Sequence, residues 1–158
     1  MKNNHIAIPV AINLAILSIP LSSLCGDLSQ SAVKVYQDRV MEIDRQRCSK
    51  PQKKKYKGLT YELCVVKGKV TFGYGDGPPG DAGPSFYLKN GKLLMFTETG
   101  TTVVYLFKDG ELEAELVNSG TPDGDKVKTK FTLAERKKII DRAVSYSNSI
   151  LKVFGRKL

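Results

Sequence analysis

The chain has 158 residues, with 25 Lys and Arg against 16 Asp and Glu, and its formal net charge is +9. It has no tryptophan, three cysteines and a single histidine, His5, which lies in an N-terminal segment typical of a secretory signal. Removal of that segment leaves no histidine, which excludes Ser-His-Asp triads, Cys-His pairs and imidazole metal sites.

Residues 1–25 are predicted to be a cleaved signal peptide. A short basic start precedes an apolar run from Ile6 to about Leu24. Two alternatives stay open: a retained membrane anchor, which Pro9 and Pro20 would interrupt, and a lipoprotein acylated at Cys25. We expect residues 26–158 to form one exported domain, secreted or periplasmic, without a retained transmembrane helix.

The number of cysteines agrees with export. Cys48 and Cys64 remain as an even pair in an oxidising compartment. A disulfide between them would close a loop of about 15 residues and stabilise the domain by about 3 kcal/mol in the chain-entropy model. Two buried free thiols are the alternative, and we predict the disulfide.

An amphipathic helix is predicted over residues 28–47. Its apolar side chains recur at spacings of three and four on one face: Val33, Tyr36, Val40 and Ile43. Its charged side chains fall on the other side: Asp38, Arg39, Asp44 and Arg45.

A basic loop is predicted from Arg45 to Lys57, since seven positive charges and no acid occur there and Pro51 ends the helix. It could bind an anionic polymer or surface, and a solvated charge run is the alternative. Tyr56 is its only aromatic residue, so single-stranded nucleic acid would find no stacking platform, and nucleic acid is not the expected partner of an exported protein. The candidate binding residues are Lys50, Lys53, Lys54, Lys55 and Lys57.

Antiparallel strands are predicted from Leu59 to about Phe131. Lys67-Gly68, Asn90-Gly91 and Asp109-Gly110 suit two-residue turns, and Thr99-Gly100 is predicted to form another. The expected pairs are Leu88 with Leu93, Phe86 with Met95, Phe96 with Val103, Met95 with Val104, and Phe107 with Leu112. The repeated aromatic-x-x-x-Asn/Asp-Gly-x-Leu pattern is similar to MORN-type repeats, with two copies and without their second glycine set, and we infer no function from it.

A glycine- and proline-rich segment, residues 73–84, is predicted to be a surface loop, because it has too few side chains for a strand. Asp76 and Asp81 lack the spacing of a calcium-binding EF-hand, and we predict no metal site and no cofactor. Together with Tyr74 they are candidate binding residues of a recognition loop, and a connection without function is the alternative.

Towards the C-terminus, an acidic row and a basic row are expected to face each other across paired strands: Glu111, Glu113 and Glu115 against Lys126, Lys128 and Lys130. A long helix follows, with a capping box at Thr132 and Glu135 and a C-terminal cap at Gly155. Its broad apolar face includes Ile139, Ile140, Ala143, Val144, Tyr146, Ile150, Leu151, Val153 and Phe154.

The predicted fold class is α+β: an N-terminal helix, an antiparallel meander of six or seven strands and a long C-terminal helix. Both faces of the central strands are apolar, so either a helix covers each face, or one face binds a partner, or the sheet curls into a half-barrel. We expect Phe86, Leu88, Leu93, Met95, Val104 and Leu106 to line a partly covered groove, with Met95 and Leu106 as candidate binding residues.

The predicted function is a small exported, non-catalytic binding module for a protein or an anionic polymer or surface. An inhibitor of a secreted enzyme and a cell-envelope-associated protein are specific forms of it. The alternative is a carboxylate-dependent hydrolase, since carboxylates are the main acid-base groups left.

Overall fold

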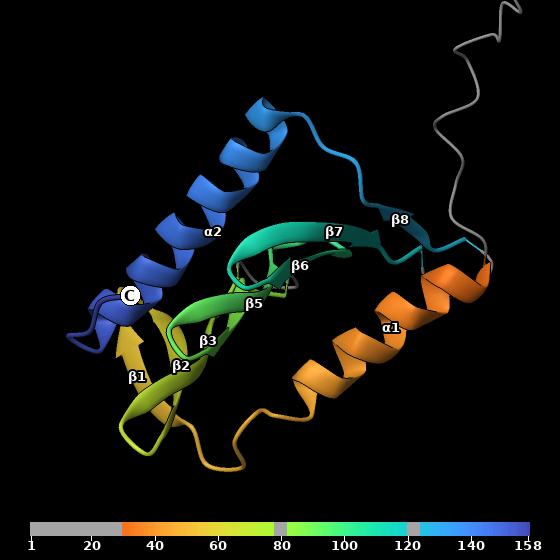
Figure 1. The fold of residues 1–158 in the computed structure, drawn as a ribbon. Coiled ribbons are helices and arrows are strands. Elements are labelled where there is room, and N and C mark those ends of the chain that lie inside the picture. The colour runs from red at the N-terminus through yellow and green to blue at the C-terminus, as the bar shows by residue number, and fades with distance from the viewer. Residues whose placement is uncertain (1–29, 78–81, 120–123) are drawn as a thin grey trace, which may run out of the picture.

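A computed structural model describes residues 30–77, 82–119 and 124–158 (Figure 1). The predicted signal peptide lies outside them. The described residues form two helices and eight strands. The predicted fold class, α+β, is confirmed, and the sheet has eight strands where six or seven were predicted. The elements are α1 (Gln30–Asp44), β1 (Gln52–Tyr56), β2 (Leu59–Val66), β3 (Lys69–Gly75), β4 (Ser85–Lys89), β5 (Lys92–Thr97), β6 (Val103–Lys108), β7 (Glu111–Val117), β8 (Lys126–Lys128) and α2 (Leu133–Val153).

The strands form one antiparallel meander in the order β1 to β8, and the sheet is open rather than closed into a barrel. The two helices lie on opposite sides of it (Figure 1). One buried cluster joins α2 to the sheet: Leu63, Phe86, Leu88, Leu93, Phe96, Tyr105, Phe107, Leu112, Ile139, Ala143, Ile150 and Leu151. The other joins α1: Val33, Ile43, Cys64, Phe72, Tyr87, Met95, Leu106, Ala114, Leu116 and Val127. Of the three outcomes considered for a two-sided apolar sheet, a helix on each face is the one found.

The tight turns follow the sequence prediction. Asn90-Gly91 and Asp109-Gly110 have positive φ at both residues, as type I′ turns require. The predicted pairs of Leu88 with Leu93 and of Phe107 with Leu112 are present.

β-Bulges shift the register of three hairpins, and one of them accounts for the predicted pair of Phe86 with Met95, which is wrong. Each hairpin has one extra residue on its second strand: Thr71 in β3, Leu94 in β5 and Glu113 in β7. The extra residue at Leu94 makes Phe86 pair with Phe96 instead of Met95. It also moves Phe86, Leu88 and Leu93 to the α2 face, while Met95, Val104 and Leu106 lie on the α1 face.

The predicted two-residue turn at Thr99-Gly100 is also wrong. The connection is longer, from residue 98 to residue 102, so Met95 pairs with Leu106 and Phe96 with Tyr105. The backbone N–H of Gly100 donates to the carbonyl of Ala82, which ties this connection to the neighbouring loop.

The C-terminal helix has both predicted ends. The hydroxyl of Thr132 accepts from the N–H of Glu135, and the carboxylate of Glu135 accepts from the N–H of Thr132. At the other end Gly155 has positive φ, its N–H donates to the carbonyl of Lys152, and the N–H of Arg156 donates to that of Leu151. This Schellman motif turns the last residues back towards the sheet.

The predicted acidic and basic rows meet only in part. Glu115 lies opposite Lys128, as expected. Glu113 is the extra residue of a bulge and forms an ion pair with Arg39 of α1 instead. Arg39 and Asp44 therefore contact the sheet side, in contrast to the prediction that both lie on the outer side of the first helix.

Candidate functional site

The predicted basic segment, residues 45–57, is not a loop throughout. Residues 52–56 form β1, which pairs with β2 in full register. Every residue of β1 is exposed. Alternation of apolar and polar residues, the usual signal for a strand, is absent here, so sequence patterning missed it.

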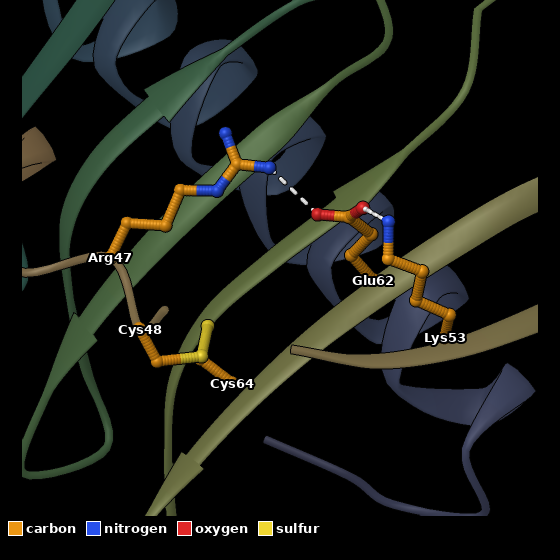
Figure 2. The surroundings of a disulfide bond; sticks show 5 residues. All are labelled: Arg47, Cys48, Lys53, Glu62 and Cys64. Carbon is orange, nitrogen blue, oxygen red and sulfur yellow. Dashed lines mark hydrogen bonds and ion pairs between the residues drawn. A yellow bond between two sulfur atoms is a disulfide. The ribbon is translucent and has the colours of Figure 1, made fainter. Parts of the chain in front are cut away.

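Several charges of this segment are paired within the fold. Arg47 and Lys53 both form ion pairs with Glu62, at 2.7 Å and 2.8 Å (Figure 2). Glu62 is only 9% exposed. The hydrogen bond from Lys53, aided by Arg47, lowers the pKa of Glu62 against the opposing effect of burial. The guanidinium of Arg47 also lies 4.7 Å from the ring centroid of Phe72.

Lys54 is paired as well, with the end of a helix. Its ammonium donates to the carbonyl of Val153 in the last turn of α2, at 2.7 Å. A cation at this position complements the negative end of the helix dipole. Among the predicted binding lysines, this leaves Lys50, Lys55 and Lys57 exposed and without an ion pair in the described part of the chain.

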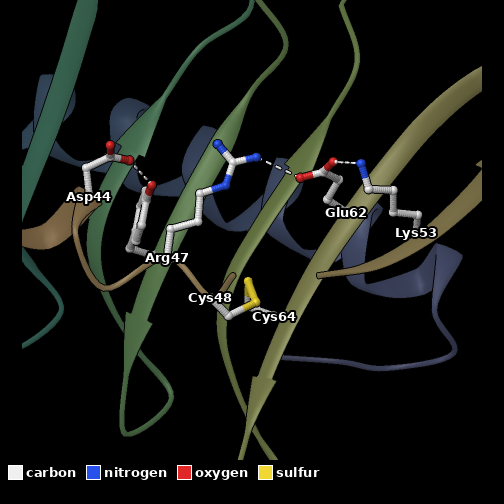
Figure 3. Close-up of polar contacts among 7 residues, drawn as sticks. Asp44, Arg47, Cys48, Lys53, Glu62 and Cys64 are labelled. Atoms are coloured by element: carbon white, nitrogen blue, oxygen red, sulfur yellow. Dashed lines mark hydrogen bonds and ion pairs between the residues drawn. A yellow bond between two sulfur atoms is a disulfide. The ribbon is translucent and has the colours of Figure 1, made fainter. Parts of the chain in front are cut away.

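The predicted disulfide fixes this segment to the sheet. Cys48 and Cys64 are bonded, with their Cα atoms 5.8 Å apart. Figure 3 shows Asp44, Arg47, Glu62 and Lys53 in a row beside the disulfide. Asp44 accepts a hydrogen bond from the hydroxyl of Tyr87. Burial, together with this carboxylate, raises the pKa of Tyr87 far above its usual value.

The glycine-rich segment begins inside a strand. Residues 73–75 belong to β3, and a Cβ at Gly73 would lie 2.3 Å from the ring of Phe86. Glycine is needed there because an aromatic side chain packs directly on the backbone. Tyr74 is half-buried on the α1 face. The carboxylate of Asp76 accepts from the N–H of Thr60 at 2.9 Å. Asp81 lies outside the described residues.

The expected groove over Met95 and Leu106 is not found. These side chains are 3% and 0% exposed, in the cluster that α1 covers. The helix covers them because Val33 and Ile43 reach the sheet and because Arg39 and Asp44 add polar contacts along the same side. Binding through Met95 or Leu106 would require α1 to leave the sheet.

A second basic surface was missed in the sequence. The turns of the β2–β3, β4–β5 and β6–β7 hairpins lie at the same end of the meander, since alternate turns of an antiparallel sheet share an end. The C-terminal residues approach the first two of these turns. A cavity of 460 Å³ between them is lined by residues of the turns and by residues 156–158. We call this surface the cationic end, and define it by Lys67, Lys69, Lys89, Lys92, Lys108, Arg156 and Lys157.

The side chains of the cationic end are all exposed. None of them forms an ion pair with another described residue. Lys89 and Lys92 lie directly opposite each other across the β4–β5 hairpin, a like-charge pair that destabilises a sheet. The nearby acids in the three turns are Asp109 and Glu111, and Glu111 lies opposite Lys108. The surface therefore has a strong positive excess.

A signal for this surface was present in the sequence. Lysine flanks each of the three turn glycines within two residues, in Lys67-Gly68-Lys69, Lys89-Asn90-Gly91-Lys92 and Lys108-Asp109-Gly110. Because these turns are about 20 residues apart in the sequence, the charges form no run. Only the alternation of turns in a meander brings them together.

Comparison of the chain with protein-family models, with curated proteins and with solved structures finds no match. Among the described residues, neither helix is both long enough and apolar enough to cross a membrane. The proposal below therefore depends on the geometry and charge of the surfaces described above.

Proposed function

We propose that this protein is a small exported, non-catalytic binding module that attaches to anionic polymers or surfaces through its cationic end. The observation that supports this most strongly is the set of exposed basic side chains at that end, without ion pairs among the described residues. Such a surface attracts polyanions, and the attraction weakens with salt.

The pair of Lys89 and Lys92 adds a second argument. Two lysines opposite each other disfavour the hairpin that holds them, so stability alone gives no reason for both. A bound anion would remove the repulsion between them. The exposed lysines of the basic segment, Lys50, Lys55 and Lys57, form a secondary contact in this proposal.

Retention on phosphocellulose at low salt tests the proposal with two matched variants. One is Lys67→Glu/Lys69→Glu/Lys92→Glu at the cationic end, and the other is Lys50→Glu/Lys55→Glu/Lys57→Glu in the basic segment. Both change the net charge equally. We expect the first variant to elute at much lower salt than the second. Equal elution of both variants would show that net charge alone governs retention, and would contradict the proposal.

Export has its own test. The intact mass of protein recovered outside the cytoplasm should correspond to a chain that begins near residue 26 and lacks two hydrogens, owing to the Cys48–Cys64 disulfide. Recovery of the full-length chain from the cytoplasm with free thiols would contradict this part of the proposal.

A further inference from the structure

The cationic end contains a pocket between two neighbouring hairpins. It lies beside the β4–β5 and β6–β7 turns and has a volume of 410 Å³. Basic residues from three elements line it: Arg39 from α1, Lys89 and Lys92 from the β4–β5 hairpin, and Lys108 from β6. One acidic residue, Asp109 of the β6–β7 turn, lines it as well, so the basic residues are in excess. Leu94 of β5, which is half-buried on the α1 side of the sheet, supplies apolar surface to it. The pocket thus combines an excess of positive charge with an apolar surface.

The two turns are in contact at this pocket. A Cβ placed on Gly110 would lie 3.8 Å from the side chain of Lys92, so the stem of this lysine packs beside the neighbouring turn. Lys89 lies directly across from Lys92 in the register. The β4–β5 and β6–β7 turns therefore lie side by side at Lys92, and their lysines belong to one continuous surface.

The donors left in the pocket favour one class of anion. The guanidinium of Arg39 is already engaged, with the carboxylate of Glu113 and with the carbonyl of Phe107 at 2.7 Å. Lysine ammonium groups bind phosphate as point charges, and a cluster of them attracts a phosphate monoester, which is close to dianionic at neutral pH, more strongly than a singly charged carboxylate. Lys89, Lys92 and Lys108 are the basic groups that remain, and the carboxylate of Asp109 offsets one of their three charges.

We propose that this pocket binds a phosphate ester, with the phosphate among Lys89, Lys92 and Lys108 and the organic part on the apolar surface. This inference deepens the proposed function, because it names the ligand class at one part of the cationic end. It also explains why Lys89 and Lys92 are kept opposite each other. The phosphate could belong to a soluble ester or to a lipid headgroup.

Calorimetric titration with phenyl phosphate and with benzoate tests the class, since the two probes share an aromatic body and differ in the anion. At low salt and pH 7.5, we expect saturable binding of phenyl phosphate and at least about tenfold weaker binding of benzoate. Affinity for phenyl phosphate should fall as the pH drops through about 6, where a phosphate monoester takes up its second proton. Equal affinity for both probes would overturn the proposal.

Two double variants test the place. Lys92→Gln/Lys108→Gln should weaken phenyl phosphate binding by at least about tenfold, and Lys67→Gln/Lys69→Gln, with the same charge change at the same end, should leave it nearly unchanged. All four side chains are exposed, and an unchanged melting temperature verifies the fold. Equal losses in both variants would contradict a defined pocket.

Vesicles that contain phosphatidic acid distinguish the source of the phosphate. If the protein co-sediments with these vesicles, and if both Lys92→Gln/Lys108→Gln and added phenyl phosphate abolish this binding, the ligand is a lipid headgroup. If the protein binds phenyl phosphate but not the vesicles, the ligand is a soluble ester. If phenyl phosphate fails to bind while retention on phosphocellulose still depends on the cationic end, the pocket inference fails and the proposed function stands. If phenyl phosphate binds but retention on phosphocellulose does not depend on the cationic end, the proposed function fails and the pocket inference stands.

Discussion

The two basic regions of this protein differ in what their charges do. The basic segment at residues 45–57 is the densest run of positive charge in the sequence, yet several of its side chains are structural. Arg47 and Lys53 bind Glu62, and Lys54 caps α2. The cationic end is drawn from turns and a terminus far apart in the sequence, and its side chains have no ion pair among the described residues.

The difference shows that charge density along the chain does not measure the charge available to a ligand. A run of lysines beside a buried carboxylate and a helix end stabilises the fold, whereas scattered lysines at shared turns stay available. Substitutions in the basic segment should therefore change stability more than binding, and substitutions at the cationic end should do the opposite.

The largest expected effect comes from the disulfide that fixes the basic segment. Cys48→Ser/Cys64→Ser should lower the free energy of unfolding by about 3 kcal/mol, the value of the chain-entropy model for a loop of this length. Denaturant titration measures it, and reduction of the wild-type protein is the control. Phosphocellulose retention of the folded variant should be unchanged. A loss of retention without unfolding would break the comparison.

Glu62 should have the next largest effect. Glu62→Gln removes the shared partner of Arg47 and Lys53 and should cost about 1–2 kcal/mol at pH 7. The hydrogen bond from Lys53 lowers the pKa of Glu62 below its ordinary value of 4.5, so its contribution is present above about pH 4.5 and is lost as the pH falls through the pKa of the folded state. Unfolding at pH 7 and at pH 3 should show the difference between the two proteins shrinking in acid. A difference that is the same at both pH values would contradict the role of the carboxylate.

Lys54 offers a smaller effect with a close control. Lys54→Met removes the donor to the carbonyl of Val153 and should lower stability by about 0.5 kcal/mol. Lys55→Met changes the adjacent residue of the same exposed strand and should have almost no effect. Thermal melts of both variants measure the contrast. Equal losses would show that the strand, and not the helix cap, needs the charge.

One substitution is expected to raise stability. Lys92→Glu replaces a like-charge pair with an opposite-charge pair across from Lys89 and should raise stability by about 0.2–1 kcal/mol, while it weakens retention. Lys108→Glu is the matched control, since it creates a like-charge pair with Glu111 and should lower stability by a similar amount. A loss of stability in Lys92→Glu would remove the argument that Lys89 and Lys92 are kept for binding.

Local chemistry made much of the fold predictable. The Lys-Gly, Asn-Gly and Asp-Gly turns, the capping box at Thr132 and Glu135, and the cysteine pair are set by a few neighbouring residues or by a simple count, and all are found. The bulges at Leu94 and Glu113 were not predictable, because a bulge shifts every later pair while it leaves the pattern of apolar residues almost unchanged.

The candidate site was less predictable for a similar reason. Met95 and Leu106 were assigned to one apolar face correctly, but the extent to which α1 covers that face depends on contacts such as Arg39 with Glu113, which no short pattern contains. Lys89, Lys92 and Lys108 come together only when the order of the strands is known. Sequence reasoning identified the basic charge and missed its location.

The place of β1 in the strand order has one more consequence. Among the described residues, no strand pairs with its outer edge, whose N–H and C=O groups could recruit a strand from another molecule. Its sequence, Gln-Lys-Lys-Lys-Tyr, is fully exposed, and the strand at the other edge, β8, has only three residues, two of them lysines. Lysine-rich and very short edge strands oppose edge-to-edge aggregation. The lysines of β1 and β8 therefore oppose the addition of a strand from a second molecule at both edges of the sheet.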